Sequence, residues 1–196
     1  VYGCVLGYDL IADEMKDKEL SELVKRIGLV EGMPVVTNPG IIDPEKFADE
    51  VINVRIPNPF MPDTPQRIAT DTSQKVGIRY GETIKSYVAK DGSARALTAI
   101  PLAIAGWCRY LLGIDDNGEA FELSPDPMAD ELKCQLDGIV WGESSSYTGQ
   151  LKNLLSNANI FGINLYEAGI GDKIEEMFVE EIAGKGAVRN TLKKYL

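Results

Sequence analysis

Three cations and one acid recur at intervals of four residues near the middle of the chain: Arg67, Asp71, Lys75 and Arg79. If the segment from Pro65 to Val76 is helical, this spacing places their side chains close to one face. Arginine can hold a carboxylate or neighbouring hydroxyls in a fork, and lysine supplies a compact positive charge. An aspartate can orient either cation. The pattern therefore favours a site for an anionic or polyhydroxylated small molecule.

A solvent-exposed ladder of ion pairs from Arg67 to Asp71 to Lys75 is the alternative interpretation, because charged helix faces usually face water. Two features favour a ligand. Hydroxyl and amide side chains, which are poor formers of exposed helix, fill the positions between the charges: Thr70, Thr72, Ser73 and Gln74. A stiff, proline-rich link also precedes the segment, and in it Asn58 is either a turn residue or a further ligand contact.

The elements that must position these residues are predicted to be helices, because almost no segment alternates apolar and polar residues with a period of two. Asp17 and Asp43 are predicted N-caps. We expect Gly77 and Gly81 to break or bend the helix that starts at Pro65, and Pro101 to kink a central apolar helix. The expected helical segments are 1–11, 17–28 or 17–32, 43–54, 65–76, 82–89, 94–112, 128–136, 144–155, 173–183 and 187–196. The fold class is thus mainly α, in a single domain spanning 1–196.

The composition indicates a folded soluble domain and argues against two other classes of protein, membrane-spanning and nucleic-acid-binding. The chain has 196 residues, of which 44% are hydrophobic and 26% charged, as in an ordinary folded soluble domain. We find neither an apolar run long enough to span a bilayer nor a signal peptide. The formal charge of −10 argues against general nucleic-acid binding. We expect the cysteines to be buried reduced thiols in a cytoplasmic protein: Cys4, Cys108 and Cys134.

Several catalytic and metal sites are excluded by what the sequence lacks. It contains no histidine, which removes Ser-His and Cys-His pairs and most zinc sites, and it has no glycine-rich phosphate loop. The run Asp115-Asp116-Asn117 lacks the spacing and closing glutamate of a calcium loop, so we predict no metal site. Packing and helix-end roles are expected for Trp107, Arg109 and Tyr110. A solvent-exposed acidic face is expected for Glu175, Glu176, Glu180 and Glu181.

Several linked motifs resemble the C-terminal domain of the mannitol dehydrogenase family, which comprises polyol-specific long-chain dehydrogenases and hexuronate reductases. The first is Arg55-Ile-Pro-Asn58-Pro59, followed by the run from Arg67 to Lys75. The second runs from Pro101 to Gly113 and continues into Asp115-Asp116-Asn117-Gly118 and Asp126-Pro127-Met-Ala-Asp130. Their order and spacing agree with the family over the whole chain, from Val1 to Leu196.

The resemblance implies a multi-helical substrate domain related in architecture to the C-terminal domain of 6-phosphogluconate dehydrogenase. It also implies hydride transfer between NAD or NADP and a sugar alcohol or sugar acid. In the family an N-terminal Rossmann domain holds most of the nicotinamide cofactor, and we expect such a domain to be absent from residues 1–196. Arg67 and Lys75 match the family's substrate-contacting arginine and lysine, and Asn58 is carried over only as part of the motif.

The catalytic residues of the family do not fall within this chain. The resemblance places the catalytic lysine, with its asparagine and histidine, just upstream of Val1, so this chain alone is expected to be inactive. The extra cation Arg79 favours a sugar acid of the D-mannonate or D-fructuronate type, while mannitol, arabinitol or a phosphorylated polyol remains open. A stand-alone helical interaction module without catalysis is the alternative of another class. We expect no partner among nucleic acids or membranes.

Overall fold

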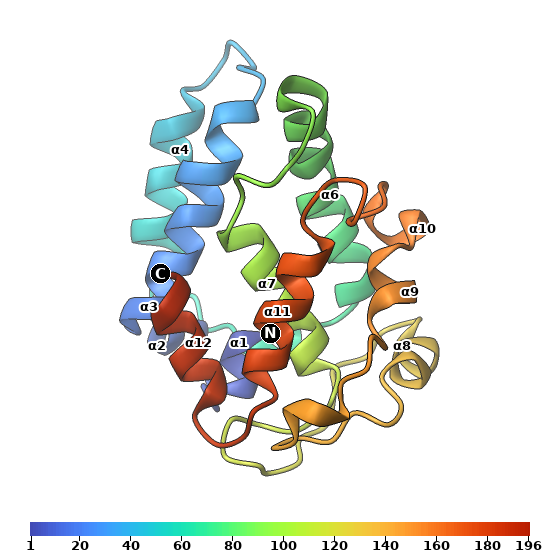
Figure 1. Ribbon diagram of the computed structural model, residues 1–196. Helices are drawn as coiled ribbons and strands as arrows, with labels where there is room; N and C mark the ends of the chain where they lie inside the picture. Colours follow the sequence, from blue (N-terminus) through green and yellow to red (C-terminus); the bar gives the residue numbers. More distant parts are fainter.

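The computed structural model describes residues 1–196, and its regular elements are helices (Figure 1). The mainly α prediction is confirmed, and the single antiparallel bridge joins Ile114 to Ala120. None of the helices is both long and apolar enough to cross a bilayer. In chain order the α-helices are α1 (Tyr2–Val5), α2 (Ile11–Glu14), α3 (Lys18–Lys25), α4 (Pro44–Glu50), α5 (Pro65–Ile68), α6 (Thr72–Asp91), α7 (Ala99–Tyr110), α8 (Ala129–Gln135), α9 (Lys152–Leu155), α10 (Ala158–Phe161), α11 (Gly171–Glu181) and α12 (Ala187–Tyr195).

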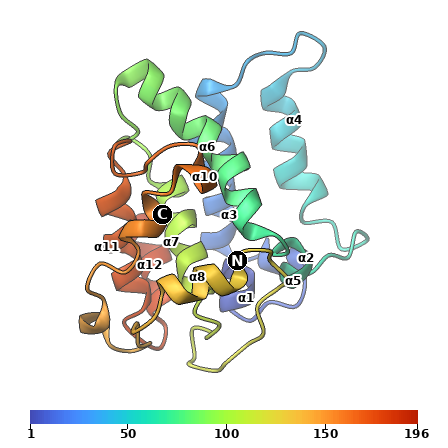
Figure 2. The ribbon, with the colours of Figure 1, turned by 90° about the vertical axis from the view of Figure 1, so that its right-hand side faces the viewer.

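Helix α7 is the centre of the core, and every one of its residues is buried. It packs most extensively against α11 and also contacts α1, α6 and α12, so that helices surround it on several sides (Figures 1 and 2). Its first turn is capped by the buried carboxylate of Glu31, which accepts hydrogen bonds from the backbone N–H groups of Thr98, Ala99 and Ile100 at 2.6–2.8 Å. The predicted kink at Pro101 is wrong, because α7 starts at Ala99 and a proline fits in the first turn of a helix.

Helix α6 runs without interruption from Thr72 to Asp91, so the predicted break at Gly77 and Gly81 is wrong. The two glycines instead allow α6 to lie directly on the backbone of α10. A Cβ atom at Gly77 would lie 1.6 Å from the carbonyl oxygen of Ile160, and one at Gly81 would lie 2.2 Å from that of Phe161. The glycines serve helix packing and not helix termination.

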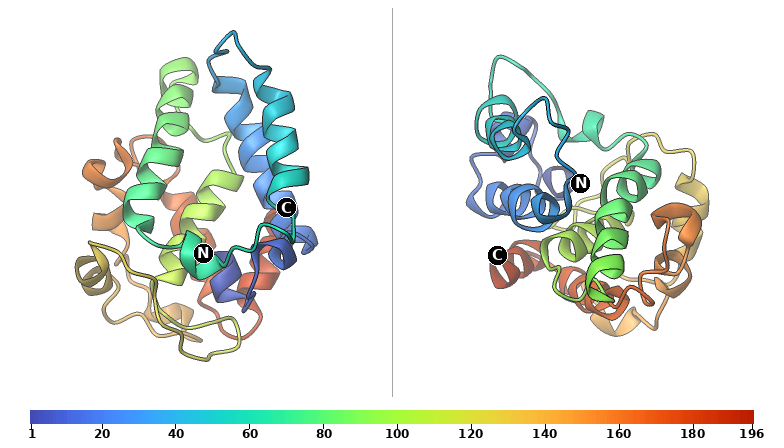
Figure 3. Two further views of the ribbon diagram at one scale, coloured as in Figure 1. Left: turned by 180° about the vertical axis from the view of Figure 1, so that it is seen from behind. Right: turned by 90° about the horizontal axis from the view of Figure 1, so that it is seen from above.

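A helical hairpin projects beside this body (Figures 1 and 3). Its first arm is α3, continued by the π-helical turn Arg26–Gly32 and the 3-10 turn Met33–Val35, and its second arm is α4, continued by the π-helical turn Val51–Arg55. Asp17 and Asp43 cap the two arms as predicted, since their carboxylates accept N–H groups of the first turns. Apolar side chains of the second arm are largely unpartnered, since Phe47 and Val54 are 50% and 60% exposed.

Four smaller expectations are wrong. Helix α1 ends at Val5, before the left-handed Gly7 (φ 76°), and does not extend to residue 11. Ser144–Ser146 forms a separate 3-10 turn and does not cap a helix to Leu155. Cys134 is exposed, whereas Cys4 and Cys108 are buried. The expected acidic face is not wholly in solvent, since Glu181 is fully buried.

Candidate functional site

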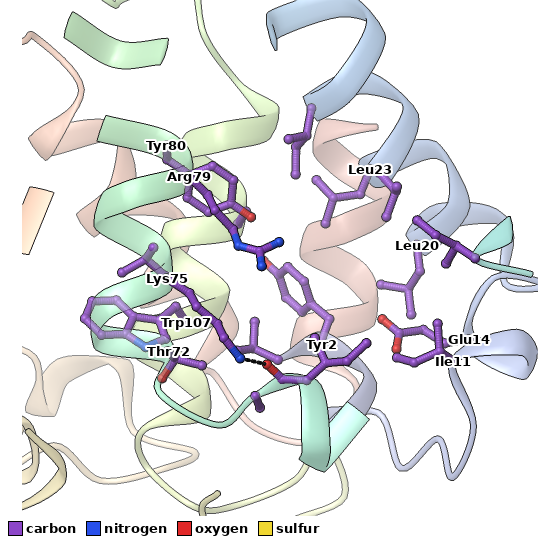
Figure 4. Close-up of a pocket in the computed structure, with 18 of the residues that line it drawn as sticks. Tyr2, Ile11, Glu14, Leu20, Leu23, Thr72, Lys75, Arg79, Tyr80 and Trp107 are labelled. Carbon is purple, nitrogen blue, oxygen red and sulfur yellow. Dashed lines mark hydrogen bonds between the residues drawn. The ribbon is translucent and has the colours of Figure 1, made fainter. Parts of the chain in front are cut away.

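A cavity of about 380 Å³ lies between α6 and the start of the hairpin (Figure 4). Apolar residues of α3 and the following turn form one wall: Leu20, Leu23, Val24 and Ile27. The opposite wall is the face of α6 that carries Thr72, Lys75, Val76, Arg79 and Tyr80. Tyr2 of α1 and Trp107 of α7 also line it. Because 15 of the 19 lining residues are hydrophobic, the few polar groups determine which ligand the cavity fits.

Two cations stand one helical turn apart on the α6 wall. Lys75 Nζ donates one hydrogen bond to the carbonyl oxygen of Ile68 at 3.0 Å, which leaves its other hydrogens available. Arg79 lines the same cavity and makes no hydrogen bond or ion pair with the protein. Figure 4 shows both side chains extending from α6 into the space between the helices. This wall is therefore suited to bind an anionic group.

The first turn of α6 is held by Asp126, which lies in the loop before α8. Its carboxylate accepts hydrogen bonds from the Thr72 hydroxyl at 3.0 Å and from the Ser73 N–H at 2.8 Å, and it also accepts the Ser73 hydroxyl. Burial acts to raise the pKa of Asp126, but the hydrogen bonds from Ser73 outweigh it and hold that pKa below its ordinary value. Asp126 thus serves as the side-chain cap that α6 otherwise lacks.

The segment from Pro65 to Val76 is not one helix, and the predicted face is divided. Helix α5 ends at Ile68, and Asp71 adopts a left-handed conformation with φ 55° before α6 begins. The Arg67 side chain is 73% exposed and forms an ion pair with Asp63, outside the cavity. Asp71 forms no ion pair with Arg67 or Lys75. The predicted ladder is therefore absent.

Asn58 also lies outside the cavity lining. Its side-chain oxygen accepts the backbone N–H of Phe60 at 2.9 Å, which is the geometry of a turn residue. Of the five residues predicted to contact a ligand, the structure brings together Lys75 and Arg79 in the cavity. The other three, Arg67, Asp71 and Asn58, do not line the cavity.

Sequence reasoning missed the acidic residue of this cavity, Glu14 on α2. Its half-buried carboxylate lines the cavity and makes no hydrogen bond or ion pair with the protein. Burial raises the pKa of Glu14 above its ordinary value. No local pattern marks it, because α2 is only four residues long and the partners that bury Glu14 come from elsewhere in the chain.

Behind the cavity, Tyr2 connects the site to a buried polar cluster. Its hydroxyl lies 2.7 Å from the carbonyl oxygen of Leu102 and 2.5 Å from Oε1 of Glu181. Burial raises the pKa of Glu181 to about 8, so this carboxyl is neutral below that pH. Arg109 is also buried and donates to the carbonyl oxygens of Glu181 and Ile114. As expected, Arg109 and Trp107 have packing roles.

No group of His, Cys, Asp or Glu residues is arranged to hold a metal ion. The carboxylates of Asp115 and Asp116 instead accept hydrogen bonds from backbone N–H groups. Asp116 accepts the N–H groups of Val188 and Arg189 at the start of α12, at 2.9 and 3.2 Å. The fold also contains no strand-to-helix turn of the dinucleotide-binding type.

Comparison with known proteins places this fold and cavity in context. A D-mannonate oxidoreductase of Thermotoga maritima is 55% identical over 195 residues, which is 99% of this chain and 36% of that protein. A D-mannonate oxidoreductase of Escherichia coli is 30% identical over 67% of this chain and 26% of its own length. The chain therefore spans about a third of the length of these relatives.

The fold is shared with a solved structure. The mannitol 2-dehydrogenase of Pseudomonas fluorescens, determined as a ternary complex with NAD and D-mannitol, aligns with a TM-score of 0.76 and 21% identity. The alignment covers 98% of this chain and 36% of that one. A model of the mannitol dehydrogenase C-terminal domain matches residues 1–182. The chain thus belongs to the mannitol dehydrogenase family, and it corresponds to that family's C-terminal domain.

Proposed function

We propose that this chain is the substrate-binding C-terminal domain of an NAD(P)-dependent oxidoreductase that interconverts a sugar acid and its keto form. The D-mannonate and D-fructuronate pair is the favoured substrate class. The observation that carries the proposal is the 55% identity to a D-mannonate oxidoreductase over 99% of this chain. A polyol such as mannitol or arabinitol is the second candidate, because the fold is also that of a mannitol 2-dehydrogenase.

The cavity supports a sugar acid over a neutral polyol. Lys75 and Arg79 put two positive charges on one wall of a largely apolar space, and Arg79 has no partner in the protein. A carboxylate forms a hydrogen-bonded ion pair with each cation, whereas a polyol hydroxyl offers only a neutral acceptor. Lys75 is half-buried and Arg79 is exposed at the mouth of the cavity, so both cations can reach an anionic group that enters it. Lys75 and Arg79 therefore hold the carboxylate in this proposal.

The nicotinamide cofactor belongs to the remainder of the protein. NAD or NADP, when bound there, supplies the hydride acceptor, and the residues of this chain bind and orient the substrate and exclude water from it. The N-terminal Rossmann domain is the partner that completes the site. The three cysteines form no disulfide, which supports a reducing, cytoplasmic location.

Arg67 keeps its proposed role as a substrate contact, on the evidence of its match to the family motif. Its neighbour Ile68 lines the cavity, while the Arg67 side chain turns outward to Asp63. To contact the substrate, the Arg67 side chain would have to leave Asp63 and turn toward the cavity. Asp71 and Asn58 are proposed to act on the substrate only indirectly, by shaping the turns that precede α6 and α5.

The test is a substrate screen of the full-length enzyme with NAD and with NADP, using mannonate, altronate, mannitol and arabinitol. We expect turnover of mannonate with a kcat/KM well above that of mannitol. Arg79→Gln and Lys75→Met are expected to reduce kcat/KM for mannonate by about 10- to 100-fold each, the loss of one charge-assisted contact. Ile78→Gln, on the exposed face of the same helix, is the matched control. Preferred turnover of mannitol, or unchanged kinetics in both cation variants, would contradict the proposal.

A further inference from the structure

We infer that Glu14 is a substrate-binding residue, whose carboxylate accepts a hydrogen bond from a substrate hydroxyl across the cavity from Lys75 and Arg79. The inference rests on the proposed function, since it takes the cavity to be the sugar-acid site. It adds a cavity-lining acceptor to a site whose other two predicted acceptors, Asp71 and Asn58, lie outside the cavity lining. A ligand with a carboxylate at one end and hydroxyls along its length is complementary to that arrangement.

The geometry of Glu14 is that of a site residue and not of a surface acid. Its half-buried carboxylate lines the cavity without any hydrogen-bond or ion-pair partner. Figure 4 shows the carboxylate on the α2 side, directed toward the space into which Lys75 and Arg79 extend from α6. The opposite charges line the same cavity yet form no ion pair with one another. A bound molecule can therefore lie between them.

The backbone next to Glu14 leaves space for its carboxylate. A Cβ atom at Gly3 would lie 2.2 Å from Oε2 of Glu14, so any side chain there would displace the carboxylate. Gly3 is buried in α1 and has an ordinary helical conformation, and its missing side chain makes room both for Glu14 and for Pro65, whose Cγ would lie 2.8 Å from such a Cβ. The absence of a side chain at residue 3 keeps the Glu14 carboxylate inside the cavity.

The electrostatic cost of this placement indicates a role in binding. An unpaired, partly desolvated carboxylate is unfavourable for the free protein, and burial accordingly raises the pKa of Glu14. Other acids nearby are satisfied: Asp13 pairs with Lys16, and Asp17 pairs with Arg189 and caps α3. The amino group of Val1 attracts Glu14 through space but forms no hydrogen bond with it, so a donor that enters the cavity would be its first hydrogen-bond partner. Sugar hydroxyls are donors of that kind.

The experiment compares Glu14→Gln with Asp13→Asn in the full-length enzyme. Both changes remove one negative charge from α2 without altering side-chain shape, but Asp13 is exposed, pairs with Lys16 and does not line the cavity. We measure KM and kcat for mannonate and the thermal midpoint without substrate. Glu14→Gln is expected to raise KM about tenfold, because a charge-assisted hydrogen bond is replaced by a weaker one. Asp13→Asn is expected to leave KM unchanged.

The thermal midpoint separates a binding role from a structural one. Removing an unpaired, half-buried charge should raise the thermal midpoint of Glu14→Gln by about 1–2 °C, while the same variant binds substrate less tightly. An unchanged KM in Glu14→Gln, equal effects in both variants, or a lower midpoint in Glu14→Gln would overturn the inference. Wild-type enzyme that turns over neither sugar acids nor polyols would instead overturn the proposed function.

Discussion

Replacing Gly77 by alanine tests the close contact on which the position of α6 depends. The new Cβ would lie 1.6 Å from the carbonyl oxygen of Ile160, whereas ordinary contact begins at 3.4 Å, so α6 and α10 must separate by about 3.4 − 1.6 = 1.8 Å. Overpacking of this kind costs about 1–3 kcal/mol, and a backbone atom cannot rotate away as a side chain can. Ile160 and Phe161 also lose their burial against α6.

Helix propensity acts in the opposite direction. Glycine to alanine within a helix is favourable by up to about 1 kcal/mol where nothing opposes the methyl group. We therefore expect Gly77→Ala to lower the free energy of unfolding by about 1 kcal/mol, and by about 2 kcal/mol if the helices cannot relax, because the steric cost exceeds the propensity gain.

Urea and thermal unfolding of the purified protein measure this change, with Ile78→Ala as control on the 74%-exposed face of the same helix. The control should stay within about 0.5 kcal/mol of the wild type. Because Gly77 lies between Lys75 and Arg79 in sequence, a displaced α6 should also raise KM for the substrate. A gain of about 1 kcal/mol in Gly77→Ala, as expected for an unhindered helix position, would refute the reasoning.

Three further predictions concern buried charge, capping and thiol exposure. The pKa of Glu181 is near 8 when folded and near 4.5 when unfolded, so the free energy of unfolding should fall as pH rises from 4.5 to 8. Glu181→Gln should remove this fall, on the order of 5 kcal/mol, in unfolding measured against pH. Asp126→Ala should lower the unfolding free energy by about 1–2 kcal/mol through loss of the α6 cap, with the exposed Asp130→Ala as control, and equal losses in the two would contradict a capping role. Cys134→Ser should remove one rapidly labelled thiol from the native protein, since Cys134 is exposed; an unchanged count in a thiol-labelling assay would contradict that exposure.

The features that the sequence predicted correctly depend on local interactions. Asp17 and Asp43 cap their helices because a carboxylate and the N–H groups it accepts are separated by two or three residues. The predicted helices at 128–136, 173–183 and 187–196 are confirmed to within about two residues, the usual uncertainty of helix ends. Lys75 and Arg79 share a wall of the cavity because a spacing of four is one helical turn.

The incorrect predictions concern residues whose environment is set by distant parts of the chain. Gly77 and Gly81 were expected to break or bend a helix, and only the backbone of α10 explains them. The first turn of α7 is fixed by Glu31, a residue 67 positions before Thr98. Glu181 is drawn into the core by Tyr2, at the other end of the chain. No pattern within a helical turn carries such information.

The two pairs on α6 explain why a glycine contact and a cationic wall occur in one helix. Gly77 and Gly81 are separated by one turn, as are Lys75 and Arg79, and the two pairs are offset by two residues. Two residues correspond to a rotation of about 200° around a helix, so the glycine face and the cationic face are nearly opposite. Pressing the glycines onto α10 therefore directs the cations away from α10 and into the cavity. The close packing of α6 on α10 and the position of the proposed carboxylate site are consequently one structural feature, so a change that loosens the first must also displace the second.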